Sequence, residues 1–311
     1  MRVVGVMEFG GPEVLKVYDI PERHAGPGEV RVAVRAAAVN PTDTYTRNGA
    51  RAEMLKDFPP PYVPGMDIAG VVDEVGEGVS TVRIGDSVMG IVVPSGSHGG
   101  YSESIVLPAG SVTHAPRGTS HAQACTLPMN GLTARLSLDQ LALSPGDTLA
   151  VTGAAGAYGG YVVQLAKADG LRVIADASEK DEQLVRSLGA DIVVRRGSDV
   201  AARIREHVPN GVDGFADGSV QNDEIVAAVK DGGAIATVRG WKSDLERNIT
   251  LHETWVREYA QAWDKLDRLR EQAEQGLLTL RVARTFPCEE AGTAHELLQA
   301  GGTRGRFVIE F

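Results

Sequence analysis

Cysteine is scarce in this sequence: Cys125 and Cys288 are the only two among 311 residues. Two isolated thiols are too few for a disulfide framework or for a structural zinc site with several thiolate ligands. A chain without such cross-links is typical of a reducing compartment, where a hydrophobic core must supply the stability.

Positive charge and long apolar runs are also lacking. Lys and Arg number 31 against 41 Asp and Glu, a formal net charge of −10, which leaves no electrostatic footprint for nucleic acid or an anionic membrane. No stretch approaches the ~20 apolar residues that a membrane span needs, and the short N-terminal apolar run is interrupted by Glu8. The sequence therefore predicts a cytoplasmic protein that binds neither nucleic acid nor membrane.

The first third of the chain has the pattern of a β domain. Between Arg2 and Leu107, short β-type runs alternate with Gly and Pro clusters, and apolar residues alternate with others over 29–35. We expect a compact barrel here. The pattern becomes helical from Ser120 to Ser144, and 311 residues are enough for two domains.

A glycine-rich turn follows. The apolar run 149–152 ends in G-x-x-G-x-x-G over 153–159, and the apolar residues after it recur at helical spacing. Gly153 permits an unusual backbone angle, Gly156 lets the main chain approach a diphosphate, and Gly159 lets helix and strand pack closely. This strand, turn and helix predict a dinucleotide site.

Strands and helices then alternate to the end of this region. The predicted elements are 172–175, 181–188, 192–194, 200–207, 211–216, 222–229 and 234–238. Such alternation favours a doubly wound parallel sheet. A longer helix is expected over 256–269, and the strand-like run 305–311 suggests that the nucleotide domain is inserted near the end of the β domain.

Several stretches in order resemble one family. They are N-P-T-D-T-Y-T-R-N-G at 40–49, P-G-M-D-I-A-G-V-V at 64–72, G-G-Y-S-E at 99–103, N-G-L-T-A at 130–134 and the glycine turn. Together they resemble the zinc-free quinone oxidoreductase branch, the zeta-crystallin relatives, of the medium-chain dehydrogenase/reductase superfamily. The resemblance implies a Rossmann domain at 120–264 inserted into a GroES-like barrel at 1–119 plus 265–311, and a homodimer.

The zinc ligands of the superfamily's alcohol dehydrogenases are missing. Pro41-Thr42 stands where the first Cys would lie, Met66-Asp67 replaces a His-Glu pair, and the loop 94–100 has no Cys. His98 in that loop is expected to be a solvated polar residue. Without a Lewis acid, the expected substrate is already electron-poor, such as a quinone or an enone.

The resemblance assigns candidate catalytic residues to the 40–49 stretch. Asn40 resembles the residue that contacts the nicotinamide end, and Tyr45 and Arg47 resemble residues that line the substrate cleft. A phenol and a guanidinium can both donate to an oxygen that gains negative charge. In the alternative interpretation Arg47 pairs with Asp43 and Tyr45 only packs. Thr133 resembles a further position near the nicotinamide.

The cofactor's 2′ position receives conflicting signals. Asp176 ends the second strand of the nucleotide domain, where an acid binds the ribose 2′-OH of NAD and repels the phosphate of NADP. Ser178, Lys180, Arg195 and Arg196 oppose it, and relatives place a 2′-phosphate contact where Arg196 lies. NADP(H) is favoured, and NAD(H) stays possible.

The other candidate cofactor residues lie in four short segments. They are Gly153, Ala154, Ala155, Gly156, Ala157, Tyr158 and Gly159 in the turn; Asp217; Val238, Arg239 and Gly240; and Arg304, Gly305 and Arg306. Arg239 and Trp241 depart from the small residues usual in relatives, and Trp241 could belong to an interface or to the core.

The predicted function is transfer of hydride from NADPH to a quinone or enone without zinc. One alternative is an enoyl-thioester reductase of a biosynthetic pathway. Another is a non-catalytic protein that binds NADPH as a structural or redox-sensing partner, because fold alone does not give function.

Overall fold

The computed structural model describes all 311 residues and divides them into two compact units. Unit 1 comprises Met1–Met129, Arg257–Glu274 and Leu280–Phe311, and unit 2 comprises Asn130–Val256 and Gln275–Thr279. The boundaries expected at 119/120 and 264/265 thus lie at 129/130 and 256/257. One reason is that α3 (His121–Ala124) packs against strands of unit 1.

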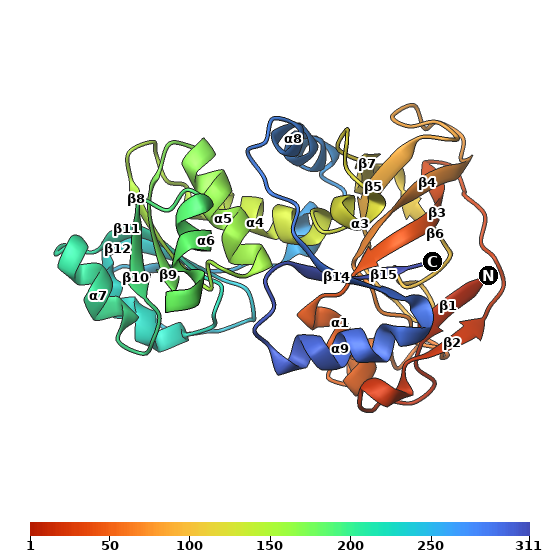
Figure 1. Ribbon diagram of the computed structural model, residues 1–311, viewed down its shortest axis with the longest axis horizontal. Coiled ribbons are helices and arrows are strands. Elements are labelled where there is room, and N and C mark those ends of the chain that lie inside the picture. The colour runs from red at the N-terminus through yellow and green to blue at the C-terminus, as the bar shows by residue number, and fades with distance from the viewer. The chain divides into compact units, whose positions relative to one another are not determined.

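Unit 1 contains a curved seven-stranded sheet (Figure 1). Its strands are β3 (Glu29–Ala38), β4 (Asp67–Val75), β5 (Ser87–Ile91), β6 (Ser104–Pro108), β7 (Val112–His114), β14 (Val282–Pro287) and β15 (Arg306–Glu310). The order is β14-β15-β3-β4-β5-β7, with β6 also paired to β3, and β1 (Arg2–Gly5) pairs separately with β2 (Lys16–Asp19). Because β15 pairs antiparallel with β3, the end of the chain returns to the first domain, as expected.

Helices also occur in the stretch expected to be all β. Unit 1 includes α1 (Pro41–Asn48), α2 (Ala52–Leu55) and, near the C-terminus, α9 (Ala291–Ala300). Asn40 is the N-cap of α1, Pro41 is its first residue, and the Asp43 side chain accepts from the Asn40 backbone N–H at 2.8 Å. This Asn-Pro-x-Asp capping signal was present in the sequence. The all-β expectation for 2–107 was therefore wrong at 41–55.

The helix expected over 256–269 is interrupted. The chain forms a 3₁₀ turn, η5 (Val256–Tyr259), and then α8 (Trp263–Glu274). The Ala260 carbonyl, which a continuous helix would bond internally, accepts a hydrogen bond from the Ser111 hydroxyl at 2.6 Å. This competing partner gives a physical reason for the break.

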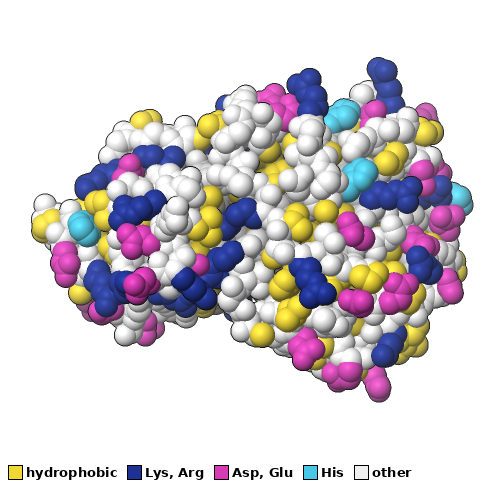
Figure 2. All heavy atoms as spheres, in the orientation of Figure 1, with side chains coloured by type: hydrophobic (Ala, Val, Ile, Leu, Met, Phe, Trp, Pro, Cys, Tyr) yellow, Lys and Arg dark blue, Asp and Glu magenta, His cyan; other side chains and the backbone are white.

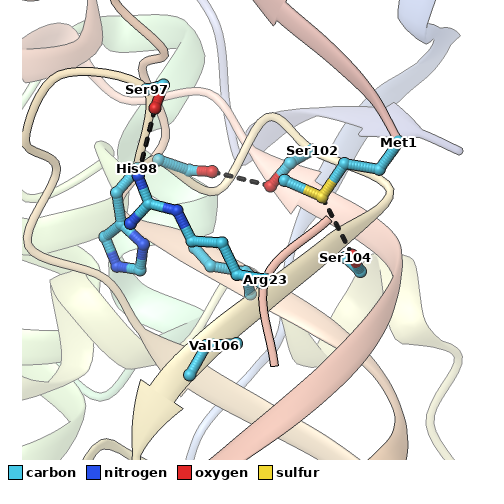
Figure 3. Close-up of a pocket in the computed structure, with 9 residues that line it drawn as sticks. Met1, Arg23, Ser97, His98, Ser102, Ser104 and Val106 are labelled. Atoms are coloured by element: carbon cyan, nitrogen blue, oxygen red, sulfur yellow. Dashed lines mark hydrogen bonds between the residues drawn. The ribbon is translucent and has the colours of Figure 1, made fainter. Parts of the chain in front are cut away.

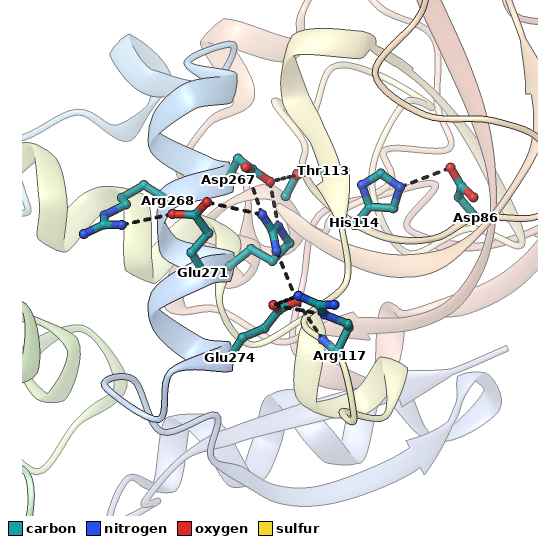
Figure 4. A network of polar contacts seen from close by, with 9 residues as sticks. Asp86, Thr113, His114, Arg117, Asp267, Arg268, Glu271 and Glu274 are labelled. Carbon is teal, nitrogen blue, oxygen red and sulfur yellow. Dashed lines mark hydrogen bonds and ion pairs between the residues drawn. The ribbon is translucent and has the colours of Figure 1, made fainter.

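Polar contacts of Asp267 and Glu274 attach α8 to β7 and to the loop after it, and the ion pairs of Arg270 lie within the helix (Figure 4). Arg270 bonds to Asp267 at 2.6 Å and to Glu274 at 3.1 Å, and Asp267 also accepts from the Thr113 hydroxyl of β7 at 2.7 Å. Glu274 accepts from the backbone N–H and the guanidinium of Arg117 at 3.0–3.2 Å. The apolar contribution of α8 comes from a few buried residues, among them Leu266 and Leu269.

Unit 2 is a six-stranded parallel sheet with flanking helices. The strand order is β10 (Ile192–Arg195), β9 (Arg172–Ala177), β8 (Thr148–Thr152), β11 (Val212–Asp217), β12 (Val229–Thr237) and β13 (Thr250–Glu253). Its helices are α5 (Ala157–Ala168), α6 (Glu182–Ser187) and α7 (Val200–His207), together with most of α4 (Pro128–Leu141). In sequence order the sheet is 3-2-1-4-5-6, which confirms the doubly wound Rossmann prediction.

Two details of unit 2 differ from or sharpen the sequence prediction. The segment 222–229 forms a 3₁₀ helix, η4 (Asn222–Ala228), instead of an α-helix. Trp241 is half-buried and packs against the core cluster formed by residues such as Phe215 and Ile235, which favours the core interpretation of Trp241.

The surface and the helix lengths agree with the composition. On the face seen in Figure 2, acidic side chains are interspersed with Lys and Arg, and no continuous basic stripe is visible. None of the helices combines the length and the apolar character needed to cross a bilayer.

Candidate functional site

The glycine turn of unit 2 has free donors at the start of a helix. Gly156 is the N-cap of α5, with no side-chain cap, and the first bonded amide of the helix is that of Gly160, which donates to Gly156. The backbone N–H groups of 157–159 are thus left without internal partners, as at any helix start. Such a terminus suits the oxygens of a diphosphate.

Two glycine roles predicted from the sequence are confirmed. Gly153 adopts φ +67°, in the left-handed region that favours glycine. A Cβ at Gly159 would lie 2.4 Å from the Gly153 carbonyl oxygen, so only glycine permits this close packing. The predicted role of Gly156 in approaching a diphosphate stays a prediction. The turn thus fits the phosphate-bearing part of a dinucleotide.

Asp176, at the end of β9, supports the turn directly. Its Oδ1 accepts from the Ala154 backbone N–H at 3.2 Å, and only 5% of the residue is exposed. Burial raises the pKa of this carboxyl, and the charge of Arg196 acts in the opposite direction. Asp176 therefore binds the protein's own backbone, with a cation close by.

The four polar residues near Asp176 have different surroundings. Arg195 lies 3.6 Å from Glu179, and the Ser178 hydroxyl donates to Asp181. Arg196 and Lys180 are exposed and form no ion pair with another side chain. Of the cations predicted for a 2′-phosphate, these two are available.

Tyr158 connects the glycine turn to α4. Its hydroxyl lies 2.8 Å from the Ser137 hydroxyl, which donates to the Thr133 carbonyl at 3.0 Å. Because the Ser137 hydrogen is used in that bond, Tyr158 is the donor of the first one. Burial raises the pKa of Tyr158, in keeping with a phenol that stays protonated. A Cβ at Gly218 would meet the Tyr158 ring at 3.0 Å.

The remaining candidate cofactor residues occupy strand ends and turns. Asp217 is fully buried and accepts from the Thr152 hydroxyl at 2.6 Å and the Asn222 backbone N–H at 2.9 Å. Thr133 is buried on α4, whereas Arg239, after β12, is exposed. The positions 304–306 belong to unit 1, where Gly305 adopts φ +109° before β15.

Tyr45 and Arg47 are not brought to one site. They lie two residues apart on α1, so their side chains leave the helix about 200° apart. Tyr45 is half-buried, whereas Arg47 is 2% exposed and donates to Gln299 of α9 at 3.2 Å. The alternative Arg47–Asp43 pair does not form either. The arrangement leaves Tyr45 as the accessible donor of the two.

Asn40 is fully buried between two carboxylates. Its Nδ2 donates to Asp67 Oδ2 at 2.7 Å, and its backbone N–H donates to Asp43 Oδ2. Burial raises the pKa of Asp43 to about 6 and that of Asp67 to about 7. The contact of Asn40 with a nicotinamide stays a prediction, because the side-chain amide of Asn40 already donates to Asp67 inside the protein.

A buried polar chain that sequence reasoning missed extends from Asp43. Tyr101 donates to Asp43 Oδ2 at 3.1 Å, and its hydroxyl oxygen lies 3.1 Å from His295 Nε2. All three side chains are buried, and His295 Nδ1 has no partner. A Tyr within G-G-Y-S-E was the only sequence signal, since His295 follows nearly two hundred residues later on α9.

The prediction that the protein has no zinc site depends on which potential metal-ligand side chains it has. No group of three or more His, Cys, Asp and Glu side chains is placed to hold a metal ion. His98 is half-buried, not solvated as expected, and burial lowers its pKa. It lines a cavity of about 10 Å³ with residues that include Arg23 and Ser97 (Figure 3). That volume holds at most one water molecule, so it is no substrate site.

Comparisons with known proteins agree with this architecture. Residues 26–117 match the alcohol dehydrogenase GroES-like domain, and residues 188–309 match the family described as zinc-binding dehydrogenase. The quinone oxidoreductase of Pseudomonas aeruginosa is 32% identical, with 97% of each chain covered. That of Mus musculus is 30% identical, with 99% of this chain and 97% of the relative covered.

Solved structures show the same fold. The quinone oxidoreductase of Coxiella burnetii has a TM-score of 0.85 at 29% identity and covers 100% of this chain and 99% of its own. A mycobacterial relative complexed with NADPH has 0.86 at 26%, with both chains covered completely. The CurK enoyl reductase has 0.86 at 25%, covering 99% and 98%. A Rossmann sheet inserted into a GroES-like barrel, with full-length relatives at this identity, shows that the chain belongs to the quinone oxidoreductase branch of the medium-chain dehydrogenase/reductase superfamily.

Proposed function

We propose that this protein transfers hydride from NADPH to a quinone or another electron-poor conjugated carbonyl, and that it does so without zinc. The observation that carries the proposal is the glycine turn of unit 2, which combines free amides at the start of α5 with Asp176, a carboxyl that bonds the turn and feels the charge of the exposed Arg196. A dinucleotide diphosphate fits the amides, and a 2′-phosphate fits a guanidinium. The NADPH complex of the mycobacterial relative supports this choice of cofactor.

The charge balance near the adenosine end also favours a phosphate. Asp176 is 5% exposed and accepts from the backbone of the turn, whereas Arg196 and Lys180 are exposed. A carboxylate that already accepts hydrogen bonds from the backbone has less capacity left to bind a ribose hydroxyl, whereas two exposed cations are free to bind a phosphate. We therefore expect Arg196→Ala to raise the KM for NADPH at least fivefold and to leave that for NADH within twofold.

The bound nicotinamide would supply the hydride. The protein's part is to hold the diphosphate at the amides of 157–159 and to provide a donor to the carbonyl oxygen that gains charge. Tyr45 is the half-buried phenol on α1 that fits this second task, and Arg47 is too deeply buried to share it. Tyr45→Phe should lower kcat about a hundredfold, the order of loss for a single donor to a developing oxyanion.

The zinc-free part of the proposal rests on which side chains are present. The positions of the superfamily's zinc ligands carry Pro41-Thr42 and Met66-Asp67, and both cysteines are buried. Such positions offer no set of thiolate and imidazole ligands. Dialysis against a chelator should therefore leave turnover unchanged. Loss of turnover that added zinc restores would contradict the proposal that the reaction needs no zinc.

The decisive experiment is anaerobic NADPH oxidation by the purified protein with a small ortho-quinone, repeated with NADH. Rapid turnover with NADPH would support the proposal. The similarity to an enoyl reductase makes an enoyl thioester the second substrate class to test. Cofactor binding without turnover on either class would instead support the non-catalytic role. Sedimentation of the same sample would test the homodimer that we also propose.

A further inference from the structure

Asp67, the first residue of β4, uses both carboxylate oxygens inside unit 1. Oδ1 accepts from the Met129 backbone N–H at 2.6 Å, and Oδ2 accepts from Asn40 Nδ2 at 2.7 Å. Met129 lies in the first turn of α4, and Asn40 is the N-cap of α1. One carboxylate thus joins the starts of two helices that are distant in the sequence.

We propose that Asp67 is a positioning residue that sets where α1 and α4 begin, and with them the predicted site residues that these helices carry. Tyr45 lies one turn into α1, and Thr133 lies one turn into α4. The inference rests on the proposed function, because it concerns the same cofactor and substrate site. Asp67 touches neither ligand in this proposal and acts only through the two helix starts.

The chemistry of a carboxylate explains why an acid stands here. An ionised carboxylate only accepts hydrogen bonds, so Asn40 must turn its NH₂ group towards Asp67 and its carbonyl oxygen away. The negative charge also lies at the N-terminus of α4, where the helix dipole stabilises it. An amide at position 67 could still accept from Met129, but its own NH₂ group would then face that of Asn40.

The surrounding charges show what this arrangement costs. Asp67 is fully buried, and both of its hydrogen-bond partners are neutral. The charge of Asp43 on α1 disfavours the ionised form of Asp67, and the charge of Arg306 on β15 favours it. The charge of Asp67 in turn raises the pKa values of the neutral Tyr101 hydroxyl and Cys125 thiol. Burial raises the pKa of Asp67 to about 7. A fold that only needed an acceptor here would be more stable with a neutral side chain.

This opposition between stability and geometry gives the test. We expect Asp67→Asn to melt at about the same temperature as the wild type at pH 8, because removal of a buried charge offsets the hydrogen bond lost to Asn40. The same variant should bind NADPH at least fivefold more weakly, measured by cofactor fluorescence, and lose at least tenfold in kcat/KM with the quinone. Wild-type kcat/KM should also fall below about pH 7 as Asp67 takes up a proton, a step absent from the variant.

Asp43→Asn is the matched control. Asp43 is equally buried and also bonds Asn40, but it does not contact α4, so NADPH binding should stay within twofold of the wild type. Equal NADPH affinity in Asp67→Asn and wild type would overturn the proposal, as would a weakened affinity in Asp67→Asn that follows a lowered melting temperature. If the wild type binds NADPH but reduces no acceptor, the proposed reductase function is wrong. The NADPH affinities of Asp67→Asn and the wild type would still test the proposed role of Asp67. If it binds neither NADPH nor NADH, both fail.

Discussion

His295 predicts how stability depends on acid. It is fully buried, its Nε2 lies 3.1 Å from the Tyr101 hydroxyl, and its Nδ1 has no partner. Burial, together with the nearby charge of Arg47, lowers the pKa of His295 to about 3, against 6.5 in an unfolded chain. Between pH 6.5 and about 3, His295 therefore binds a proton in the unfolded state but not in the folded state. The stability from neutral His295 is complete above pH 6.5 and is lost progressively as the pH falls towards 3.

The size of the effect follows from that difference. Each pH unit below 6.5 costs ~1.4 kcal/mol, so His295 lowers the free energy of unfolding by about 2 kcal/mol at pH 5. His295→Gln keeps an amide donor near Tyr101 but does not titrate. Urea unfolding at pH 8 and pH 5 should show the variant gaining about 2 kcal/mol relative to the wild type between the two. Other histidines cancel in this difference, and a gap that stays constant with pH would refute the reasoning.

Three further substitutions test other parts of the structure. Gly159→Ala places a Cβ 2.4 Å from the Gly153 carbonyl oxygen, so NADPH titration should show at least tenfold weaker binding; unchanged affinity would mean that the turn has room to move. Tyr101→Phe leaves two buried groups short of a partner and should cost ~1–3 kcal/mol in urea unfolding, and a neutral result would show that water replaces the hydroxyl. Arg47→Met removes a buried cation with two unpartnered nitrogens and should leave the KM for the quinone within threefold, whereas a large rise would restore Arg47 to the substrate site.

The sequence predicted the fold because its signals are local. Gly153 and Gly159 sit at fixed positions in a strand-to-helix turn, and the alternating elements after it are separated by short loops. The break near Ala260 was not predictable, because it depends on the Ser111 hydroxyl, which lies far away in the sequence. The start of α1 could have been predicted from Asn40, Pro41 and Asp43.

The candidate site also has some features that follow from local sequence patterns and others that depend on the tertiary structure. The turn and its neighbouring cations follow from motif spacing, and the structure places Arg196 beside Asp176. The separation of Tyr45 from Arg47 follows from helix geometry once α1 is recognised, and it was missed because the stretch was interpreted as part of a β domain. The chain from Asp43 to His295 joins three elements that no sequence pattern connects, so only the tertiary structure reveals it.

The attachment of α8 has a consequence for behaviour in salt. The ion pair between α8 and the rest of the unit joins Glu274 to Arg117, whose side chain is 88% exposed, whereas the Thr113–Asp267 hydrogen bond at the other contact is formed by a neutral hydroxyl. Dissolved ions screen exposed pairs far more than sheltered ones, over a Debye length of ~8 Å at physiological ionic strength. Rising salt should thus free the loop at Arg117, while the Thr113–Asp267 hydrogen bond and the buried Leu266 and Leu269 keep α8 in place, so that salt loosens only one end of this helix.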